Sequence, residues 1–236
     1  MSPKYTDIGS ETLQRMKVLE GYNRWIVDEI RSWVGNNVLE VGAGTGNISQ
    51  FFLDRKQLIL TDISKTYIDA LSETYKNFPN VFCEQFNLEE SGSHLTGHRI
   101  DTIIGLNVLE HIKDDLHALR EMASILSAGG RVILQLPAHK ILYGSLDRNL
   151  GHNRRYTVRE IKDKFTQSGL LPEKISRINM FGTFGWFLCS RILRKKILPE
   201  GQLSLFNTLT PVFVTLERLI PVPFGLSILA IGRKDG

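Results

Sequence analysis

The most constraining feature of this chain is a short apolar, β-branched segment that leads directly into a glycine-rich turn. Residues 37–41 predict a strand, the turn Gly42-Ala43-Gly44-Thr45-Gly46 follows, and residues 47–53 predict a helix. Glycine adopts backbone angles closed to other residues and carries no Cβ, so a bound molecule can approach such a turn closely. A strand–turn–helix unit of this kind is typical of a ligand site at the end of a strand.

Strand and helix patterns then alternate along the chain, which predicts parallel βαβ units. The fold class is therefore α/β, a Rossmann-like doubly wound and mostly parallel sheet. The further strands are predicted at residues 57–61, 81–86, 101–106 and 131–136, and the helices at residues 22–34, 64–77, 114–127 and 157–168. Thr157 and Glu160 have the capping-box spacing that begins the last of these helices.

Two more strands are predicted near the end of the chain, at residues 171–181 and 224–233. Roughly forty residues separate them, which exceeds a normal loop and predicts a helical cap inserted between the last two strands. We expect a single domain over residues 1–236, with a cofactor-binding core at 22–136. Cap and substrate elements are expected at 139–156 and 182–222.

The charge, cysteine content and apolar tracts of the chain limit the partners and the cellular location that we expect. The net charge of +4 is spread along the chain, without a basic stripe interleaved with aromatic residues, so no nucleic acid is expected as a partner. Cys83 and Cys189 lie far apart, without metal-ligand spacing, and favour a reducing, cytoplasmic location. The first residues show no secretion signal. Apolar tracts fall short of the roughly 18 residues that a transmembrane helix needs.

Asp62, at the end of the second predicted strand, is expected to bind a cofactor together with the glycine turn. A carboxylate in this place can accept hydrogen bonds from the two ribose hydroxyls of an adenosine-containing cofactor. The alternative is that Asp62 only caps the helix beginning near Ser64. Asn47 stands where a dinucleotide fingerprint needs a third glycine, and no Lys-Ser/Thr pair follows the turn as in a P-loop.

These motifs together resemble those of class I methyltransferases that use S-adenosyl-L-methionine (SAM), over residues 22–136. The segment 40–46 resembles their first motif, Asp62 their ribose-binding acid, and the segment 107–111 their fourth motif. Asn87-Leu88 resembles the stretch that meets the adenine, although the family often has Asp where this chain has Asn87. The resemblance implies a SAM-dependent enzyme whose cofactor contacts are Glu40, Gly42, Ala43, Gly44, Asp62, Asn87, Leu88 and Asn107.

Three histidines are candidate catalytic bases, needed if the acceptor is a hydroxyl. His111 ends the fourth motif, His139 follows the fifth predicted strand, and His152 lies in a loop without hydrophobic period. His111 is equally well explained as a residue that only hydrogen-bonds its turn.

The loop around His152 resembles a subset of bacterial class I methyltransferases with an LGH-x-RRY-T segment, which implies a small-molecule acceptor such as a saccharide or a lipid-linked molecule. We expect Tyr143, Arg154, Arg155 and Tyr156 to contact this acceptor, with the two arginines binding a phosphate or carboxylate. The alternative is a solvated basic turn in which Tyr156 packs as a hydrophobic staple.

Other functions stay open at this point. One is a SAM-binding protein without turnover, and another is a metal-assisted O-methyltransferase of the quinone type. The latter has Glu-x-x-Glu-His where this chain has Asn107-x-x-Glu110-His111, and the missing carboxylate argues against a metal. The apolar cap is expected to fold over the loop 139–156. Alternatively, it forms a homodimer interface or lies on a membrane surface through Arg194-Lys195-Lys196.

Overall fold

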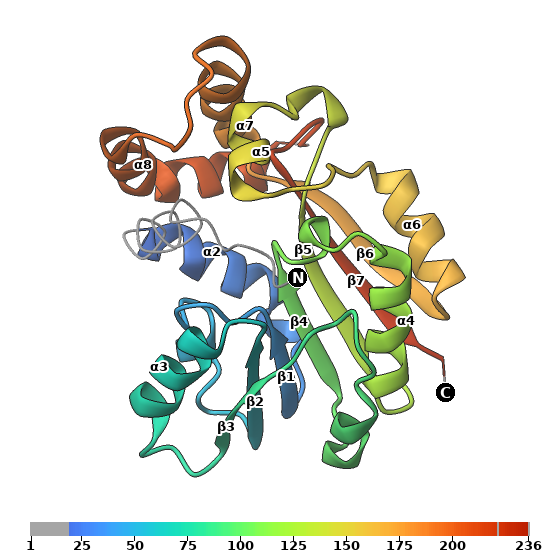
Figure 1. The fold of residues 1–236 in the computed structure, drawn as a ribbon. Coiled ribbons are helices and arrows are strands. Elements are labelled where there is room, and N and C mark those ends of the chain that lie inside the picture. The colour runs from blue at the N-terminus through green and yellow to red at the C-terminus, as the bar shows by residue number, and fades with distance from the viewer. Residues whose placement is uncertain (1–18, 221, 236) are drawn as a thin grey trace.

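The predicted strands assemble into one seven-stranded sheet in the computed structural model, which describes residues 19–220 and 222–235 (Figure 1). The strands are β1 (Asn37–Val41), β2 (Gln57–Asp62), β3 (Val81–Gln85), β4 (Thr102–Leu106), β5 (Arg131–Pro137), β6 (Leu170–Ile178) and β7 (Ser227–Lys234), in the order β3-β2-β1-β4-β5-β7-β6. β1 to β5 are parallel, and β7 runs antiparallel to both neighbours. The predicted fold class is confirmed.

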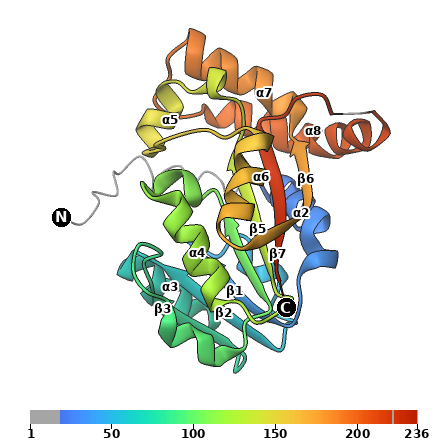
Figure 2. The same ribbon diagram turned by 90° about the vertical axis from the view of Figure 1, so that its right-hand side faces the viewer.

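Helices cover both faces of the sheet (Figures 1 and 2). Alternate residues of a strand point to opposite faces, so Leu58 and Leu60 pack with the layer of α2 and α3, whereas Ile59 packs with the layer of α4 and α6. The bounds are α2 (Glu20–Ile30), α3 (Lys65–Tyr75), α4 (Asp115–Ile125), α5 (Ser145–Leu150), α6 (Val158–Gln167), α7 (Met180–Phe187) and α8 (Glu200–Leu219). As predicted, Thr157 caps α6 in a capping box with Glu160.

Short helical turns occupy several connections. The 3-10 turns are η1 (Arg31–Trp33), η2 (Ser49–Phe51), η3 (Ser93–His98), η4 (Leu109–His111) and η5 (Lys140–Leu142), and η6 (Leu188–Ile192) is a π-helical turn. The predicted helix at residues 47–53 is therefore wrong, because only the turn η2 forms there. Only residues 47–56 are available to lead the chain from the glycine turn back to the start of β2, which leaves no room for a full crossover helix.

The predicted helical cap lies between β6 and β7 and consists of α7, η6 and α8. β6 ends at Ile178, earlier than predicted, because Asn179 has a left-handed φ of 64° and its side chain accepts a hydrogen bond from the Gly182 N–H at the start of α7. Both views show α5, α7 and α8 gathered beyond one end of the sheet. α8 also packs on α2, where the Gly21 N–H donates to Asn207 Oδ1 at 3.1 Å.

The fold leaves the predictions on a secretion signal and on domain organisation untested. The N-terminal residues for which we predicted no secretion signal lie outside the described ranges. Within those ranges, no helix combines the length and the hydropathy that crossing a membrane requires. The single-domain organisation stays a prediction.

Candidate cofactor and acceptor site

The glycine turn after β1 is held in a conformation that suits glycine. The φ angles of Gly42 and Gly44 are 68° and 54°, in the left-handed region that other residues enter only with strain. The N–H of Ala43, between them, donates to the Thr61 carbonyl at 2.9 Å and ties the turn to β2. A Cβ on Gly42 would lie 2.6 Å from Cγ2 of Val108. The turn therefore touches the segment after β4, which carries the predicted fourth motif.

Asp62 ends β2 beside this turn and is only 4% exposed. One carboxylate oxygen accepts from the Gly44 N–H at 3.0 Å, and the other accepts from the Ser64 N–H at 2.8 Å, just before α3. Burial raises the pKa of Asp62, while these backbone N–H groups oppose the rise. Each oxygen has a second acceptor position, so the observed contacts are compatible with further donors. The ribose contact stays a prediction.

Glu40 is a second buried carboxyl group at the turn, 5% exposed. It accepts a hydrogen bond from the Ser49 hydroxyl at 2.6 Å. Burial raises its pKa to about 7, the Ser49 hydrogen bond opposes the rise, and the nearby charge of Asp62 adds to it. The hydroxyl of Thr45 in the same turn is buried without a hydrogen-bond partner among the described residues.

The other predicted cofactor residues follow β3 and β4. The Asn87 side chain accepts from the Glu89 N–H at 3.0 Å and donates to the Glu90 carboxylate at 3.3 Å, so it holds its own loop. Leu88 is 3% exposed and packs in the core, which leaves its backbone as the part that can meet a ligand. Asn107 has φ 55° and an exposed side chain. Their contacts with a cofactor stay predictions.

Arg155 is buried and does not have the predicted role of binding a phosphate or carboxylate of an acceptor. Its Nε donates to Asp147 Oδ1 at 2.7 Å and NH1 donates to the Ala138 carbonyl at 2.9 Å. The side chains of Arg155 and Asp147 are 1% and 0% exposed, and the guanidinium lies 4.8 Å from the centre of the Trp186 ring. The predicted phosphate contact of Arg155 is therefore wrong, because the fold buries this cation with its own counter-ion.

Arg154 and Tyr156 also have partners within the protein. Arg154 NH1 lies 2.8 Å from Asp115 Oδ2, and its NH2 donates to the Lys113 carbonyl. The hydroxyl of Tyr156, a residue 1% exposed, donates to the same Asp115 oxygen at 2.9 Å. The alternative reading of this loop holds for Tyr156, which packs in the core instead of facing an acceptor. The charge of Arg154 is paired with Asp115, but its side chain is 32% exposed, and its contact with an acceptor stays a prediction.

The structure brings two of the three candidate histidines together. The rings of His111 and His152 meet edge to face, with centroids 4.9 Å apart. His139 lies elsewhere and accepts a hydrogen bond from the Gly225 N–H at its Nε2, at 3.4 Å. Burial lowers the pKa of His139, and the charges of Arg177 and Arg155 lower it further. Tyr143 donates its hydroxyl proton to the His152 carbonyl and so positions this loop.

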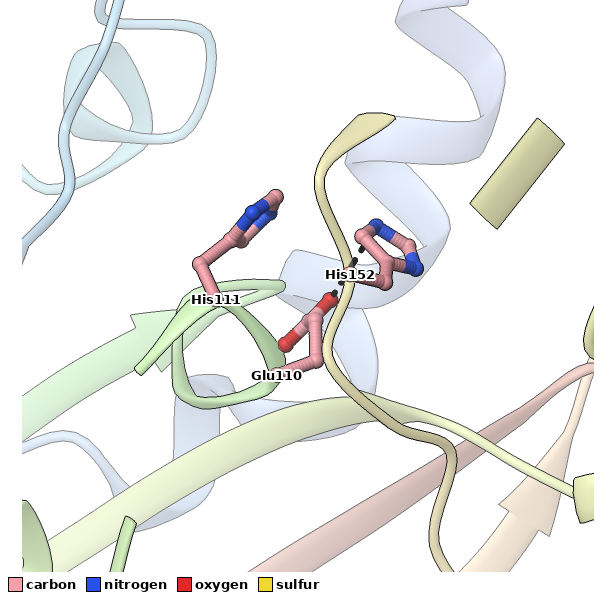
Figure 3. A group of neighbouring side chains, drawn as sticks. All are labelled: Glu110, His111 and His152. Carbon is pink, nitrogen blue, oxygen red and sulfur yellow. Dashed lines mark ion pairs between the residues drawn. The ribbon is translucent and has the colours of Figure 1, made fainter. Parts of the chain in front are cut away.

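Glu110 joins the histidine pair and is a residue that we did not place in the predicted site (Figure 3). Its carboxylate is fully buried, lies 3.9 Å from His152 Nε2 and has no hydrogen-bond partner among the described residues. Burial raises its pKa to about 7, and His152 opposes the rise. The sequence contains one indication that Glu110 belongs to the site, because Glu110 directly precedes His111 in the predicted fourth motif. The distant His152 was not expected there.

The cap contacts the loop 139–156 at one edge. Arg191 donates to the Tyr143 carbonyl at 3.0 Å, and the Ser145 hydroxyl donates to the Ser190 carbonyl at 3.0 Å. This contact leaves some large apolar side chains of the cap exposed, with Phe184 at 62% and Leu205 at 60%. Within the described ranges, α7 and α8 therefore keep exposed apolar side chains.

Comparison with known proteins is consistent with this geometry. The family model described as a methyltransferase domain matches residues 39–132. A highly reducing polyketide synthase of Strobilurus tenacellus is 32% identical over 109 residues, 41% of this chain and 4% of that protein. Malonyl–acyl carrier protein O-methyltransferase 1 of Ilyobacter polytropus is 26% identical over 129 residues, 51% of this chain and 47% of that protein. The chain thus spans less than half the length of these relatives.

Solved structures agree on the fold. An S-adenosylmethionine-dependent methyltransferase from Mesorhizobium loti has a TM-score of 0.63 at 13% identity, over 92% of this chain and 100% of that one. The fold and the glycine turn define a class I methyltransferase core, whose family uses SAM as the methyl donor. The match to the methyltransferase family model covers residues 39–132, less than half of the chain.

Proposed function

We propose that the chain transfers a methyl group from SAM to a small-molecule acceptor. The observation that carries this proposal is the pairing of the left-handed glycine turn with the buried Asp62, whose carboxylate holds Gly44 in place at 3.0 Å. Such a turn allows close approach of the cofactor, and the remaining acceptor positions of Asp62 suit the ribose hydroxyls. The methyl group of SAM is already activated, so the protein mainly has to align the acceptor behind it.

Calorimetric titration of SAM into Asp62→Ala tests the cofactor site. We expect at least tenfold weaker binding, because the loss of a charge-assisted hydrogen bond costs about 1.5–3 kcal/mol and 1.4 kcal/mol is a factor of ten. Asp62→Asn keeps an oxygen acceptor, so its affinity for SAM should lie between the affinities of the wild type and Asp62→Ala. Asp69→Asn is the matched control, since Asp69 is an exposed carboxylate on α3 that pairs with Lys65. Unchanged affinity in a folded Asp62→Ala protein contradicts the ribose contact.

Turnover separates an enzyme from a binding protein. The wild type should produce S-adenosylhomocysteine from SAM with a panel of hydroxyl and amine acceptors that includes saccharides and lipid-linked saccharides. Asp62→Ala should lose this product at SAM concentrations that saturate Asp69→Asn. Tight SAM binding without product over the panel favours the alternative, a SAM-binding protein without turnover.

For the acceptor, we propose a lipid-linked molecule, because the cap has an apolar stripe that is exposed among the residues that the structure describes. On α8, exposed apolar side chains recur every three or four residues, namely Leu205, Leu209, Val212, Leu216 and Leu219. The exposed cations Arg194, Lys195 and Lys196 lie between η6 and the start of α8. An apolar helix face with adjacent cations is typical of a segment that lies on an anionic lipid surface. Since the cap touches the loop 139–156, a lipid-linked acceptor would be held near that loop.

Vesicle flotation tests this second part. The wild type should float with phosphatidylglycerol-containing vesicles and much less with pure phosphatidylcholine vesicles. Val212→Asp combined with Leu216→Asp should abolish flotation, and replacing the three cap cations by Gln should remove the preference for anionic lipid. Lys65→Gln with Lys76→Gln is the matched control, because both lysines are exposed on or beside α3, outside the cap. A stable dimer that covers the stripe and does not float contradicts the lipid proposal.

A further inference from the structure

Three potential metal ligands converge from two distant parts of the chain (Figure 3). Glu110 and His111 lie in η4, directly after β4, and His152 lies in the loop after α5. One donor atom from each of these residues lies within 4.8 Å of the others. None of the motifs in the sequence places His152 next to the other two residues.

Glu110 shows that this cluster is incomplete as it stands. Both of its oxygens are buried, and neither has a hydrogen-bond partner among the described residues. Buried carboxylates are normally hydrogen-bonded, and an exception calls for a physical explanation. The Nε2 atom of His152 lies 3.9 Å from Glu110 Oε1, too far for a hydrogen bond. An ion between these two atoms would satisfy both.

His152 is already oriented as a ligand. Its Nδ1 lies 3.1 Å from Asp147 Oδ1, and Asp147 is fixed in turn by Arg155 and by the Gly144 N–H. A carboxylate at Nδ1 assigns the proton to that nitrogen, which leaves the lone pair of Nε2 facing Glu110. This carboxylate–histidine arrangement is the one that metal-binding histidines usually have. Asp147 therefore acts as a positioning residue.

We propose that Glu110, His111 and His152 bind one divalent transition-metal ion, with Zn²⁺ as the preferred occupant. Two imidazoles and one carboxylate are the ligand set of open zinc sites, which keep a fourth position for water or substrate. Donors around tetrahedral Zn²⁺ are roughly 3.3 Å apart, so the cluster has to contract. His111 has an exposed side chain and can rotate to do so.

These three ligands differ from the Glu-x-x-Glu-His set of quinone-type O-methyltransferases. In that comparison, Asn107 replaces the first carboxylate, which argued against a metal. In the fold, Asn107 is exposed after β4 and is not a member of the cluster, and the third ligand comes from His152 instead. The absence of a carboxylate at position 107 therefore does not decide whether a metal binds. The proposal is independent of methyl transfer, because it concerns ion binding by the protein alone.

Metal titration of the chelator-treated protein tests the proposal without SAM or acceptor. Co²⁺ should bind with one equivalent and give the visible absorption of a low-coordinate nitrogen and oxygen site, and Zn²⁺ should displace it. Glu110→Gln, His111→Ala and His152→Ala should each weaken Zn²⁺ binding at least tenfold. Asp147→Asn should weaken it by roughly 10–100-fold while leaving the stoichiometry at one.

His94→Ala is the matched control, because His94 forms an exposed pair with Glu84 at 2.6 Å, away from the cluster. Its affinity for Zn²⁺ should equal that of the wild type. Circular dichroism checks that each variant is folded, and His111→Ala is the safest variant because that side chain is exposed. Wild-type protein that binds no stoichiometric ion overturns the proposal, as does a folded His111→Ala protein with unchanged affinity.

Discussion

Replacing Glu40 by glutamine should make the protein more stable, and the gain should depend on pH. Burial raises the pKa of Glu40 from 4.5 to about 7 in the folded protein. The folded state therefore keeps a proton that the unfolded chain releases, and the free energy of unfolding falls as pH rises from about 4.5 to 7. One pKa unit corresponds to about 1.4 kcal/mol, so the loss from this one group approaches about 3 kcal/mol above pH 7.

Glutamine resembles the protonated carboxyl group and still accepts from Ser49, so Glu40→Gln removes only the titration. Urea unfolding without SAM should give equal stabilities near pH 4.5 and a variant more stable by up to about 3 kcal/mol at pH 8. The other buried carboxyl groups titrate in both proteins, so their effects cancel in the difference, except for Asp62, whose charge interacts with that of Glu40.

Glu89→Gln is the control, because Glu89 is exposed. Its stability should differ from that of the wild type by the same small amount at every pH. A Glu40→Gln stability difference that does not change between pH 4.5 and 8 refutes the reasoning, since it would mean that Glu40 ionises in the folded protein as easily as in the unfolded chain.

Three further substitutions test the turn, the loop and a helix cap. Gly44→Val should abolish SAM binding in calorimetry, because a β-branched residue disfavours its φ of 54° and fills the space near the ligand; normal binding contradicts the close approach. Arg155→Ala should lower the free energy of unfolding by about 3–5 kcal/mol in urea titrations, because Asp147 remains buried without its cation. A loss below 1 kcal/mol contradicts that view. Thr157→Ala should cost about 1 kcal/mol in the same assay, since its side chain accepts from the Glu160 N–H.

The sheet could be predicted because each strand carries its own local signal. β1, β2, β4 and β5 are short apolar runs, and the glycine turn and the cap of α6 are short motifs of neighbouring residues. Errors arose where the local signal is ambiguous. An apolar run does not show where a strand becomes a helix, so the end of β6 at Ile178 depends on the left-handed Asn179.

The acceptor site was harder to predict because a charge in the sequence does not reveal its partner. Arg154 and Arg155 look alike in a basic loop, yet Arg154 pairs with Asp115 and Arg155 with Asp147. One partner lies on a distant helix and the other a few residues upstream in α5. Only the fold shows that both cations already have counter-ions, and only the fold brings His152 to Glu110.

Asp147 contacts both the buried Arg155 and the candidate ligand His152. Its Oδ1 accepts from Arg155 Nε at 2.7 Å and lies 3.1 Å from His152 Nδ1. The arginine that we expected to bind an acceptor therefore fixes the carboxylate that orients a candidate ligand. The composition of the loop, rich in Gly, His, Arg and Tyr, predicted a functional segment; that function stays a prediction, and the contacts within the loop differ from those expected. The arginines and Tyr156 hold the loop to the core, so that His152 presents its free nitrogen to Glu110 beside the end of β4.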